Sequence, residues 1–171
     1  MEESQLMKNE ENFFEGPYYT YLCGPMHFKT HDEMAGWRNY VKSKLDDCYD
    51  PVEREIDKHD VNGIVERDLI DIEASNFLIV NYDGESPSVG SSMEMFFASH
   101  NVSPSRLIIT VTDCEEYSAF LTYHSDLILK KNGFEGFDKA TQIINQMKNL
   151  FEQRNNEDKK LNEDILDILS Q

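Results

Sequence analysis

The sequence predicts an α/β domain in which helices cover both faces of a mostly parallel sheet. The runs FLIVNYD at residues 77–83 and RLIITVTD at residues 106–113 are mostly apolar, which is typical of strands buried on both faces. Segments with apolar residues at steps of three and four alternate with these runs, as expected for helices that connect parallel strands. The chain has 171 residues, the size of one domain with a sizeable core.

Strands and helices are expected to alternate along the whole domain. We expect about five strands, at residues 18–24, 48–51, 77–83, 106–113 and 127–130, the second as a short strand end or turn and the last at an edge. We expect helices at residues 33–45, 62–74 and 137–151, and one that starts at Ser91. The domain organisation is interpreted as a mobile acidic leader at residues 1–16, the domain at 17–152 and an acidic C-terminal tail at 153–171.

Charge and composition argue against several kinds of partner. The net charge of −17 is unsuited to a nucleic acid polymer or an anionic membrane, because both need clustered Lys and Arg. No apolar run approaches the ~20 residues of a membrane span. The 3 cysteines and 5 histidines show no spacing typical of zinc sites or disulfide frameworks, so we expect no metal, no cofactor and a cytoplasmic location. A small anion can still bind, because backbone amides at the start of a helix bind phosphate without a basic patch.

Glu94 lies where a ligand of such a sheet is expected. In SVGSSMEMFF, residues 88–97, it follows a small-residue turn behind the strand FLIVNYD, and open α/β sheets bind their ligands at such strand-to-helix junctions. The same residues also fit the pattern S-x-x-E, in which Ser91 would cap the helix and Glu94 would bind the Ser91 amide. Glu94 is therefore either part of a helix cap or a reactive group.

Asp68 interrupts the apolar face of the helix expected at residues 62–74. A carboxylate on a core-facing helix surface must be ion-paired, be protonated or take part in the function of a site. Asp68 is therefore either salt-bridged, for example by Arg67 or Arg38, or functional. The apolar face is expected to hold Val61, Ile64, Val65, Leu69 and Ile72, with Asp71 and Glu73 solvated beside it.

Tyr21 adds a hydroxyl near the end of the first expected strand. It is either a packed core tyrosine or a hydrogen-bond partner for a buried carboxylate at the same sheet edge. One tyrosine and two acids at a sheet edge indicate a possible site, but these residue types alone do not identify a reaction.

Several segments in order, TYLCGPM, GWRNY, DP, IVERDLIDIEASNFLIVNYD and SVGSSMEM, resemble the nucleoside 2-deoxyribosyltransferase-like family. The resemblance covers roughly residues 18–113, and this family includes 2'-deoxynucleoside 5'-monophosphate N-hydrolases. It implies a Rossmann-like or flavodoxin-like three-layer sandwich, a homodimer or larger assembly, and cleavage or transfer at the N-glycosidic bond of a nucleoside or nucleotide. It also implies that Glu94 is the nucleophile, that Tyr21 orients it, and that Asp68 delivers a proton to the base or orients sugar and base.

The chain departs from the family pattern in the residues expected to bind substrate. Transferases acting on free nucleosides commonly carry an aspartate where this chain has Ser88, whereas the monophosphate hydrolases place a serine there, so Ser88 favours a 5'-monophosphate. The first loop, GPMHFKTH, lacks the arginine of those hydrolases, and Lys29 or Arg38 is a possible replacement. Ser92 and Phe96 replace the glycines that are usual at these positions in the family, so these two residues do not identify the substrate. The expected substrate-binding residues are Gly24, Ser88, Gly90, Ser91 and Ser92.

Two other functions remain open at this point. One is deoxyribosyl transfer between free nucleosides, and the other is a non-catalytic nucleotide-binding or sensing module that keeps the same fold. Hydrolysis and transfer differ only in whether water or a second base resolves the covalent intermediate, so the residues do not decide between them.

Overall fold

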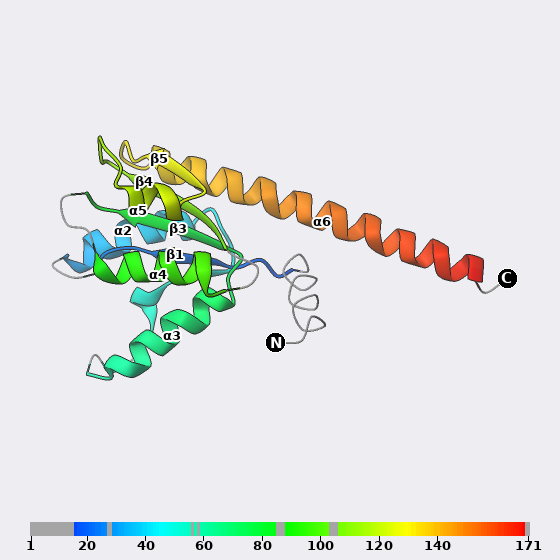
Figure 1. The fold of residues 1–171 in the computed structure, drawn as a ribbon, viewed down its shortest axis with the longest axis horizontal. Coiled ribbons are helices and arrows are strands. Elements are labelled where there is room, and N and C mark those ends of the chain that lie inside the picture. The colour runs from blue at the N-terminus through cyan, green and yellow to red at the C-terminus, as the bar shows by residue number, and fades with distance from the viewer. Residues whose placement is uncertain are drawn as a thin grey trace.

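A five-stranded parallel sheet forms the centre of the molecule (Figure 1). The computed structural model describes residues 16–26, 29–55, 57, 59–84, 88–102 and 106–169, with side chains up to residue 157. The expected leader therefore lies outside the described residues except for Gly16. The strand order is β2-β1-β3-β4-β5. The strands are β1 (Thr20–Cys23), β2 (Cys48–Tyr49), β3 (Phe77–Tyr82), β4 (Leu107–Thr112) and β5 (Leu127–Lys130).

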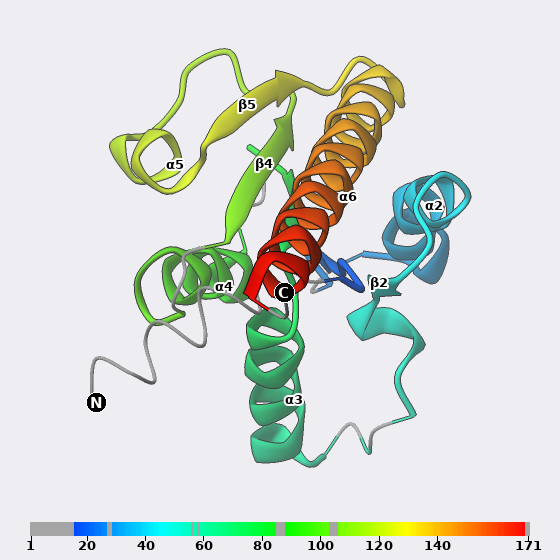
Figure 2. The same cartoon turned by 90° about the vertical axis from the view of Figure 1, so that its right-hand side faces the viewer.

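Helices cover both faces of the sheet, which confirms the predicted α/β three-layer architecture (Figure 2). Helices α2 and α6 lie on one face, where the rings of Trp37 and Phe137 stack with their centroids 5.2 Å apart. Helices α3, α4 and α5 lie on the other face, where Ile72 and Met95 are fully buried. The helices are α2 (His31–Lys42), the 3-10 turn η1 (Pro51–Glu53), α3 (Val61–Glu73), α4 (Val89–His100), α5 (Ala119–His124) and α6 (Glu135–Leu169).

The strand order places the topological switch point of the sheet between β1 and β3, and ligands of open α/β sheets bind at such a point. From β1 the chain turns to one side to form β2, and from β3 it continues to the other side, so the carboxyl ends of β1 and β3 form the topological switch point. Side chains alternate along β1, so Leu22 packs with α2 and α6 whereas Tyr21 and Cys23 face the layer of α3 and α4. This alternation brings Tyr21 toward the helices that carry Asp68 and Glu94.

Three helix predictions differ from the structure. Helix α5 was not expected, because its six residues are too few to show a periodicity. Helix α4 begins at Val89 with Ser88 as its N-cap, not at Ser91. Helix α6 does not end near residue 151 but continues to Leu169, and Figure 1 shows its C-terminal part extending well beyond the sheet. The domain boundary at residue 152 stays a prediction.

The apolar face expected for α3 is confirmed for Ile72 and wrong for Val61 and Val65. Val61 and Val65 are 67% and 52% exposed, whereas Asp68, Asp71 and Ile72 are buried. The helix therefore turns two carboxylates toward the protein interior, and Asp71 is not the solvated charge that the periodicity predicted. Among the described helices, none has the length and hydropathy needed to cross a membrane.

Candidate active site

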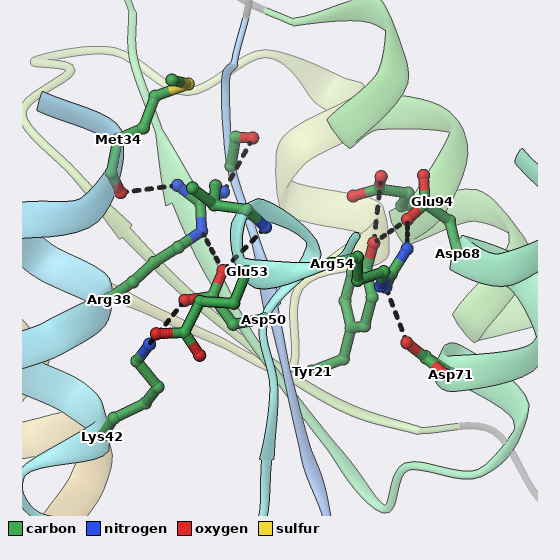
Figure 3. A network of polar contacts seen from close by, with 12 residues as sticks. Tyr21, Met34, Arg38, Lys42, Asp50, Glu53, Arg54, Asp68, Asp71 and Glu94 are labelled. Atoms are coloured by element: carbon green, nitrogen blue, oxygen red, sulfur yellow. Dashed lines mark hydrogen bonds and ion pairs between the residues drawn. The ribbon is translucent and has the colours of Figure 1, made fainter. Parts of the chain in front are cut away.

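The three residues predicted to carry chemistry come together at the carboxyl end of β1. The Tyr21 hydroxyl lies 3.1 Å from Oδ1 of Asp68 and 3.3 Å from Oε1 of Glu94 (Figure 3). Strand β1 supplies the tyrosine, α3 the aspartate and α4 the glutamate. The predicted meeting of Tyr21 with a buried carboxylate is present twice, since one hydroxyl contacts both acids.

Tyr21 acts as a hydrogen-bond donor in this cluster. Its side chain is fully buried. Burial first, and then the negative charges of Glu94 and Asp68, raise the pKa of Tyr21 well above its usual value. The hydroxyl therefore keeps its proton. A single proton can serve only one carboxylate at a time, so one of the two acids is always left without it.

The arrangement of α4 decides between the two readings of Glu94. Ser88 caps the helix, because its Oγ accepts a hydrogen bond of 3.3 Å from the Ser91 amide. Glu94 lies in the second turn, on the inner side of the helix with Ser91 and Ala98, and its carboxylate contacts Tyr21. The capping-box interpretation of Glu94 is therefore wrong.

The environment of Glu94 disfavours its charged form. Burial raises the pKa of Glu94, and the negative charge of Asp68 raises it further. Hydrogen bonds from the Cys23 thiol and the Tyr21 hydroxyl oppose this shift without cancelling it. The position of Glu94 near the start of a helix, which alone would favour the ionised form, is thus outweighed by desolvation. The Glu94 side chain is half-buried, so it keeps some contact with solvent.

Cys23 is a member of the cluster that sequence reasoning did not identify. The side chain is fully buried, and its Sγ lies 3.7 Å from the carbonyl oxygen of Ser91. Burial, followed by the negative charge of Glu94, raises the pKa of the Cys23 thiol well above its usual value. The thiol therefore stays protonated and can donate to the Glu94 carboxylate. Alternation along β1 could have indicated this position, because Cys23 follows Tyr21 on the same side of the strand.

Asp68 is ion-paired, but not by either of the arginines that the sequence suggested. Arg54, in the segment after η1, binds Asp68 through Nη1 and Asp71 through Nη2 at 2.7 Å (Figure 3). Arg67 binds Asp71 instead, at 3.1 Å. Burial opposes the charge of Arg54, but its hydrogen bond to Asp68 and the neighbouring negative groups outweigh that effect and raise the pKa of Arg54.

Arg38 holds the loop after β1 and does not reach toward a substrate. Its side chain is fully buried and donates to the carbonyl oxygens of Gly24 at 3.1 Å and Met34 at 2.7 Å. Its Nε lies 3.4 Å from Asp50. Arg38 therefore does not supply the missing arginine of the first loop. Lys29, the other suggestion, lies 2.6 Å from Asp83 in the loop after β3.

The small residues predicted to bind substrate lie directly after β1 and at the start of α4. Gly24 is required by close packing, because an added Cβ would lie 2.9 Å from Cζ2 of Trp37. At Gly90 an added Cβ would meet only Ser88 Oγ, at 3.6 Å. The Ser92 hydroxyl donates to the Ser88 carbonyl at 3.2 Å.

Ser91 differs from the other serines of the turn. Its Oγ is buried and has no hydrogen-bond partner within the described part of the chain. An unpaired buried hydroxyl is unusual in a folded protein, and it lies in the first turn of α4, where amides are oriented to receive an anion. The Ser91 and Ser92 amides already bond to Ser88, through its Oγ and its carbonyl oxygen, so at these two positions the turn offers a buried hydroxyl and no free amide.

The described residues contain no group of three or more His, Cys, Asp and Glu side chains arranged to hold a metal ion. No model of a known protein family matches the chain, and no curated protein matches it. Arguments about function therefore rest on the geometry of the cluster and on the sequence segments that surround it.

Proposed function

We propose that the protein cleaves or transfers at the N-glycosidic bond of a 2'-deoxynucleoside 5'-monophosphate or a deoxynucleoside, through a covalent glycosyl intermediate on Glu94. The observation that carries this proposal is the contact of one tyrosine hydroxyl with two carboxylates at the switch point of the sheet. The resemblance of residues 18–113 to the nucleoside 2-deoxyribosyltransferase-like family supplies the reaction class. The geometry supports that class by joining the three residues to which the family assigns catalysis.

The separation of the carboxylates suits a covalent route. Glycosidases that form a covalent intermediate have their two carboxyl groups about 5–5.5 Å apart, whereas enzymes that use direct attack by water have them about 6.5–9.5 Å apart. In this site the same hydroxyl contacts an oxygen of each group, at 3.1 and 3.3 Å, so those two oxygens are no farther apart than the sum of these distances, which is compatible with the covalent class. Glu94 would attack the anomeric carbon as the bond to the base breaks.

The acidity of Glu94 bears on the rate. A carboxylate attacks only in its ionised form, and burial raises the pKa of Glu94 above its usual value. Activity is therefore expected to fall as the pH drops through that raised pKa. The Tyr21 hydroxyl, which keeps its proton, would orient the attacking oxygen.

A 5'-phosphate would bind at the start of α4. The first amides of a helix attract anions, and the Ser91 hydroxyl lacks a partner in the described residues. Ser88 presents no negative charge there, unlike an aspartate, which would repel a phosphate. These features favour a monophosphate over a free nucleoside, and the nucleoside transferase remains the second candidate.

A non-catalytic nucleotide-binding module is the less favoured alternative. A Glu94 occupied in a capping box would have favoured that interpretation, and the structure shows Ser88 in the capping role instead. A carboxylate with a raised pKa that faces a second carboxylate is typical of a reactive site.

The proposal also includes self-association into a homodimer or larger assembly. Exposed apolar side chains gather on α3 and α4, which neighbour each other on one face of the sheet (Figure 2). A monomer measured by light scattering at micromolar concentration would contradict this part of the proposal. The exposed residues are Val61, Val65, Ile70, Val89, Met93 and Phe96.

A panel of deoxynucleosides and their 5'-monophosphates tests the function. Purified protein is incubated with each compound, and released base is followed by chromatography, with and without a second base as acceptor. The covalent intermediate is sought by intact-protein mass spectrometry after rapid acid quenching, where the expected mass increase is that of the substrate's sugar or sugar phosphate less one water. Glu94→Gln is the control that should form neither base nor adduct. Absence of base release from every compound would refute the proposal.

A further inference from the structure

Cys23 is a buried thiol beside the proposed nucleophile, Glu94. Its side chain is fully buried at the end of β1, in the same layer of the core as Tyr21. Its Sγ lies 3.7 Å from the carbonyl oxygen of Ser91, in the first turn of α4. Glu94 follows Ser91 by three residues, so the two share one face of that helix. Cys23 therefore packs against the part of α4 that carries Glu94.

Two protonated groups of β1 donate hydrogen bonds to the Glu94 carboxylate. The Tyr21 hydroxyl lies 3.3 Å from Oε1 of Glu94 (Figure 3), and the Cys23 thiol is the second donor. The Tyr21 hydroxyl lies closer to Asp68, at 3.1 Å, and it has only one proton to give. Whenever that proton points at Asp68, the Cys23 thiol is the donor that remains for Glu94.

A thiol suits this position because it is a weak hydrogen-bond donor. A strong donor or a cation would stabilise the charge of Glu94 before attack, and that charge is lost as the bond to the sugar forms. A thiol can hold a carboxylate oxygen in place with less stabilisation of its charge. Burial raises the pKa of Cys23 well above its usual value, so the thiol stays protonated and does not compete with Glu94 as a nucleophile.

We propose that Cys23 is a positioning residue whose thiol holds the Glu94 carboxylate in the attacking orientation while the Tyr21 hydroxyl donates to Asp68. This inference rests on the proposed function, and Cys23 takes no part in the bonds that form and break. The thiol keeps its proton throughout, and its hydrogen bond also favours the ionised, attacking form of Glu94. Loss of the thiol should therefore change both the orientation and the acidity of the Glu94 carboxyl group.

The groups that act on the charge of Glu94 come from three elements. Tyr21 and Cys23 lie on β1, Asp68 on α3 and Arg38 on α2. Burial has the largest effect and raises the pKa of Glu94, the hydrogen bond from Cys23 lowers it, and the negative charge of Asp68 raises it again. Tyr21 and Arg38 also lower the pKa, but each by less than Cys23. Removal of the thiol is therefore expected to raise the pKa of Glu94 further.

Two substitutions at Cys23 should act on Glu94 in opposite directions. Cys23→Ala removes the donor, so the rising limb of the pH profile of kcat/KM should move to higher pH. Cys23→Ser replaces a weak donor with a stronger one of similar size, so the same limb should move to lower pH. A role in packing alone predicts no such opposition, because it depends on the volume of the side chain and not on its proton.

Cys48 offers a matched control. Its Sγ also lies 3.7 Å from a backbone carbonyl oxygen, that of Leu45, and its side chain is half-buried. Cys48 belongs to β2 and packs in the cluster on the other face of the sheet from Glu94. Cys48→Ala therefore removes a thiol with a similar backbone contact while leaving the donors of Glu94 in place.

The first experiment measures kcat and KM of the wild type, Cys23→Ala, Cys23→Ser and Cys48→Ala from about pH 5 to about pH 9 on the best-cleaved compound of the panel. Circular dichroism at each pH confirms that each variant is folded. On the acidic limb, Cys23→Ala should lose about 2- to 10-fold in kcat/KM, the effect of one ordinary hydrogen bond. Part of the loss should persist in kcat on the plateau. Cys23→Ser should remain active, and Cys48→Ala should match the wild type.

A titration without substrate gives a second readout. The glutamate carboxyl carbons are labelled isotopically and followed by NMR as the pH changes, and the Glu94 signal is assigned by its absence from the spectrum of Glu94→Gln. The titration midpoint of Glu94 should be higher in Cys23→Ala than in the wild type and lower in Cys23→Ser. It should be unchanged in Cys48→Ala.

Each other outcome counts against a specific statement. If both Cys23 variants keep the wild-type limb and midpoint, or if both move in the same direction, Cys23 acts through packing alone and the inference is overturned. An unchanged kcat of Cys23→Ala on the plateau would remove the positioning role. If Cys23→Ala does not fold, the limb and midpoint of Cys23→Ser decide. If the wild type cleaves no compound of the panel, the proposed function fails, whereas the titration still shows whether Cys23 binds Glu94.

Discussion

Replacing Arg54 with methionine is expected to destabilise the protein strongly. Methionine keeps most of the side-chain volume but removes the cation that binds two buried carboxylates. Breaking a buried ion pair by removing one partner typically costs about 3–5 kcal/mol, because the remaining charge is left uncompensated. Arg67 still binds Asp71 in the variant, so the expected cost lies near the lower limit, about 3 kcal/mol.

Urea unfolding measures this cost. Trp37 is the single tryptophan and is buried in the core, so its fluorescence follows unfolding of the sheet and α2. A loss of about 3 kcal/mol corresponds to a melting temperature lower by roughly 6–12 °C for a chain of this size. The matched variant Arg67→Met should lose less than about 1 kcal/mol, since its ion pair is half in solvent.

The comparison of the two variants is the check on the cause. Equal losses for Arg54→Met and Arg67→Met at neutral pH would refute the reasoning, because they would show that the buried fork adds nothing beyond an exposed pair.

Three further predictions follow from the same geometry. Glu94→Gln should abolish base release yet make the protein more stable at neutral pH. The pKa of Glu94 is raised above its ordinary value of 4.5, so the contribution of Glu94 to the free energy of unfolding is favourable at low pH and is lost as the pH rises through the raised pKa. The stability that Glu94→Gln gains at neutral pH should therefore vanish in thermal unfolding at acid pH. Gly24→Ala should cost about 1–3 kcal/mol in urea unfolding, because its Cβ would lie 2.9 Å from Trp37, whereas Gly36→Ala, with open space around its Cβ, should not destabilise. Ser88→Asp keeps a good N-cap but adds a negative charge, so it should reverse a preference of at least ~10-fold in kcat/KM for monophosphate over nucleoside; equal ratios in wild type and variant would contradict this.

The parallel strands were predictable because a strand that is buried on both faces is apolar at nearly every position. The runs around Ile79 and Ile109 are apolar on both sides of the strand, and β3 and β4 end within a residue of the expected bounds. Helix α5 could not be predicted in the same way, because six residues complete fewer than two helical turns. The start of α4 was misplaced because both Ser88 and Ser91 are good capping residues, and the sequence pattern favoured the wrong one.

The inner face of α3 shows where periodicity fails. A hydrophobic pattern assumes that apolar side chains face the core, and on that assumption Val61 and Val65 belong inside. In the structure the inner face carries Asp68 and Asp71, whose burial depends on a cation from a different segment of the chain. Nothing in the spacing of Arg54 marks it as that partner, because the loop that brings it there has no periodicity. Ion pairs between distant segments are set by the tertiary fold, and a single sequence does not record them.

The placement of Arg54 gives the two carboxylates different environments, and that difference is the strongest physical argument for their separate roles. Asp68 has a guanidinium bound to it, whereas Glu94 has no ion pair in the described residues and contacts only neutral donors, the Tyr21 hydroxyl and the Cys23 thiol. A nucleophile gains reactivity when its charge is poorly stabilised before attack, because that charge is lost as the new bond forms. A residue that must keep its charge throughout the reaction gains from a bound cation. Two carboxylates that share one hydroxyl but only one cation thus have different environments, and this difference supports the proposed role of Glu94 as the attacking group.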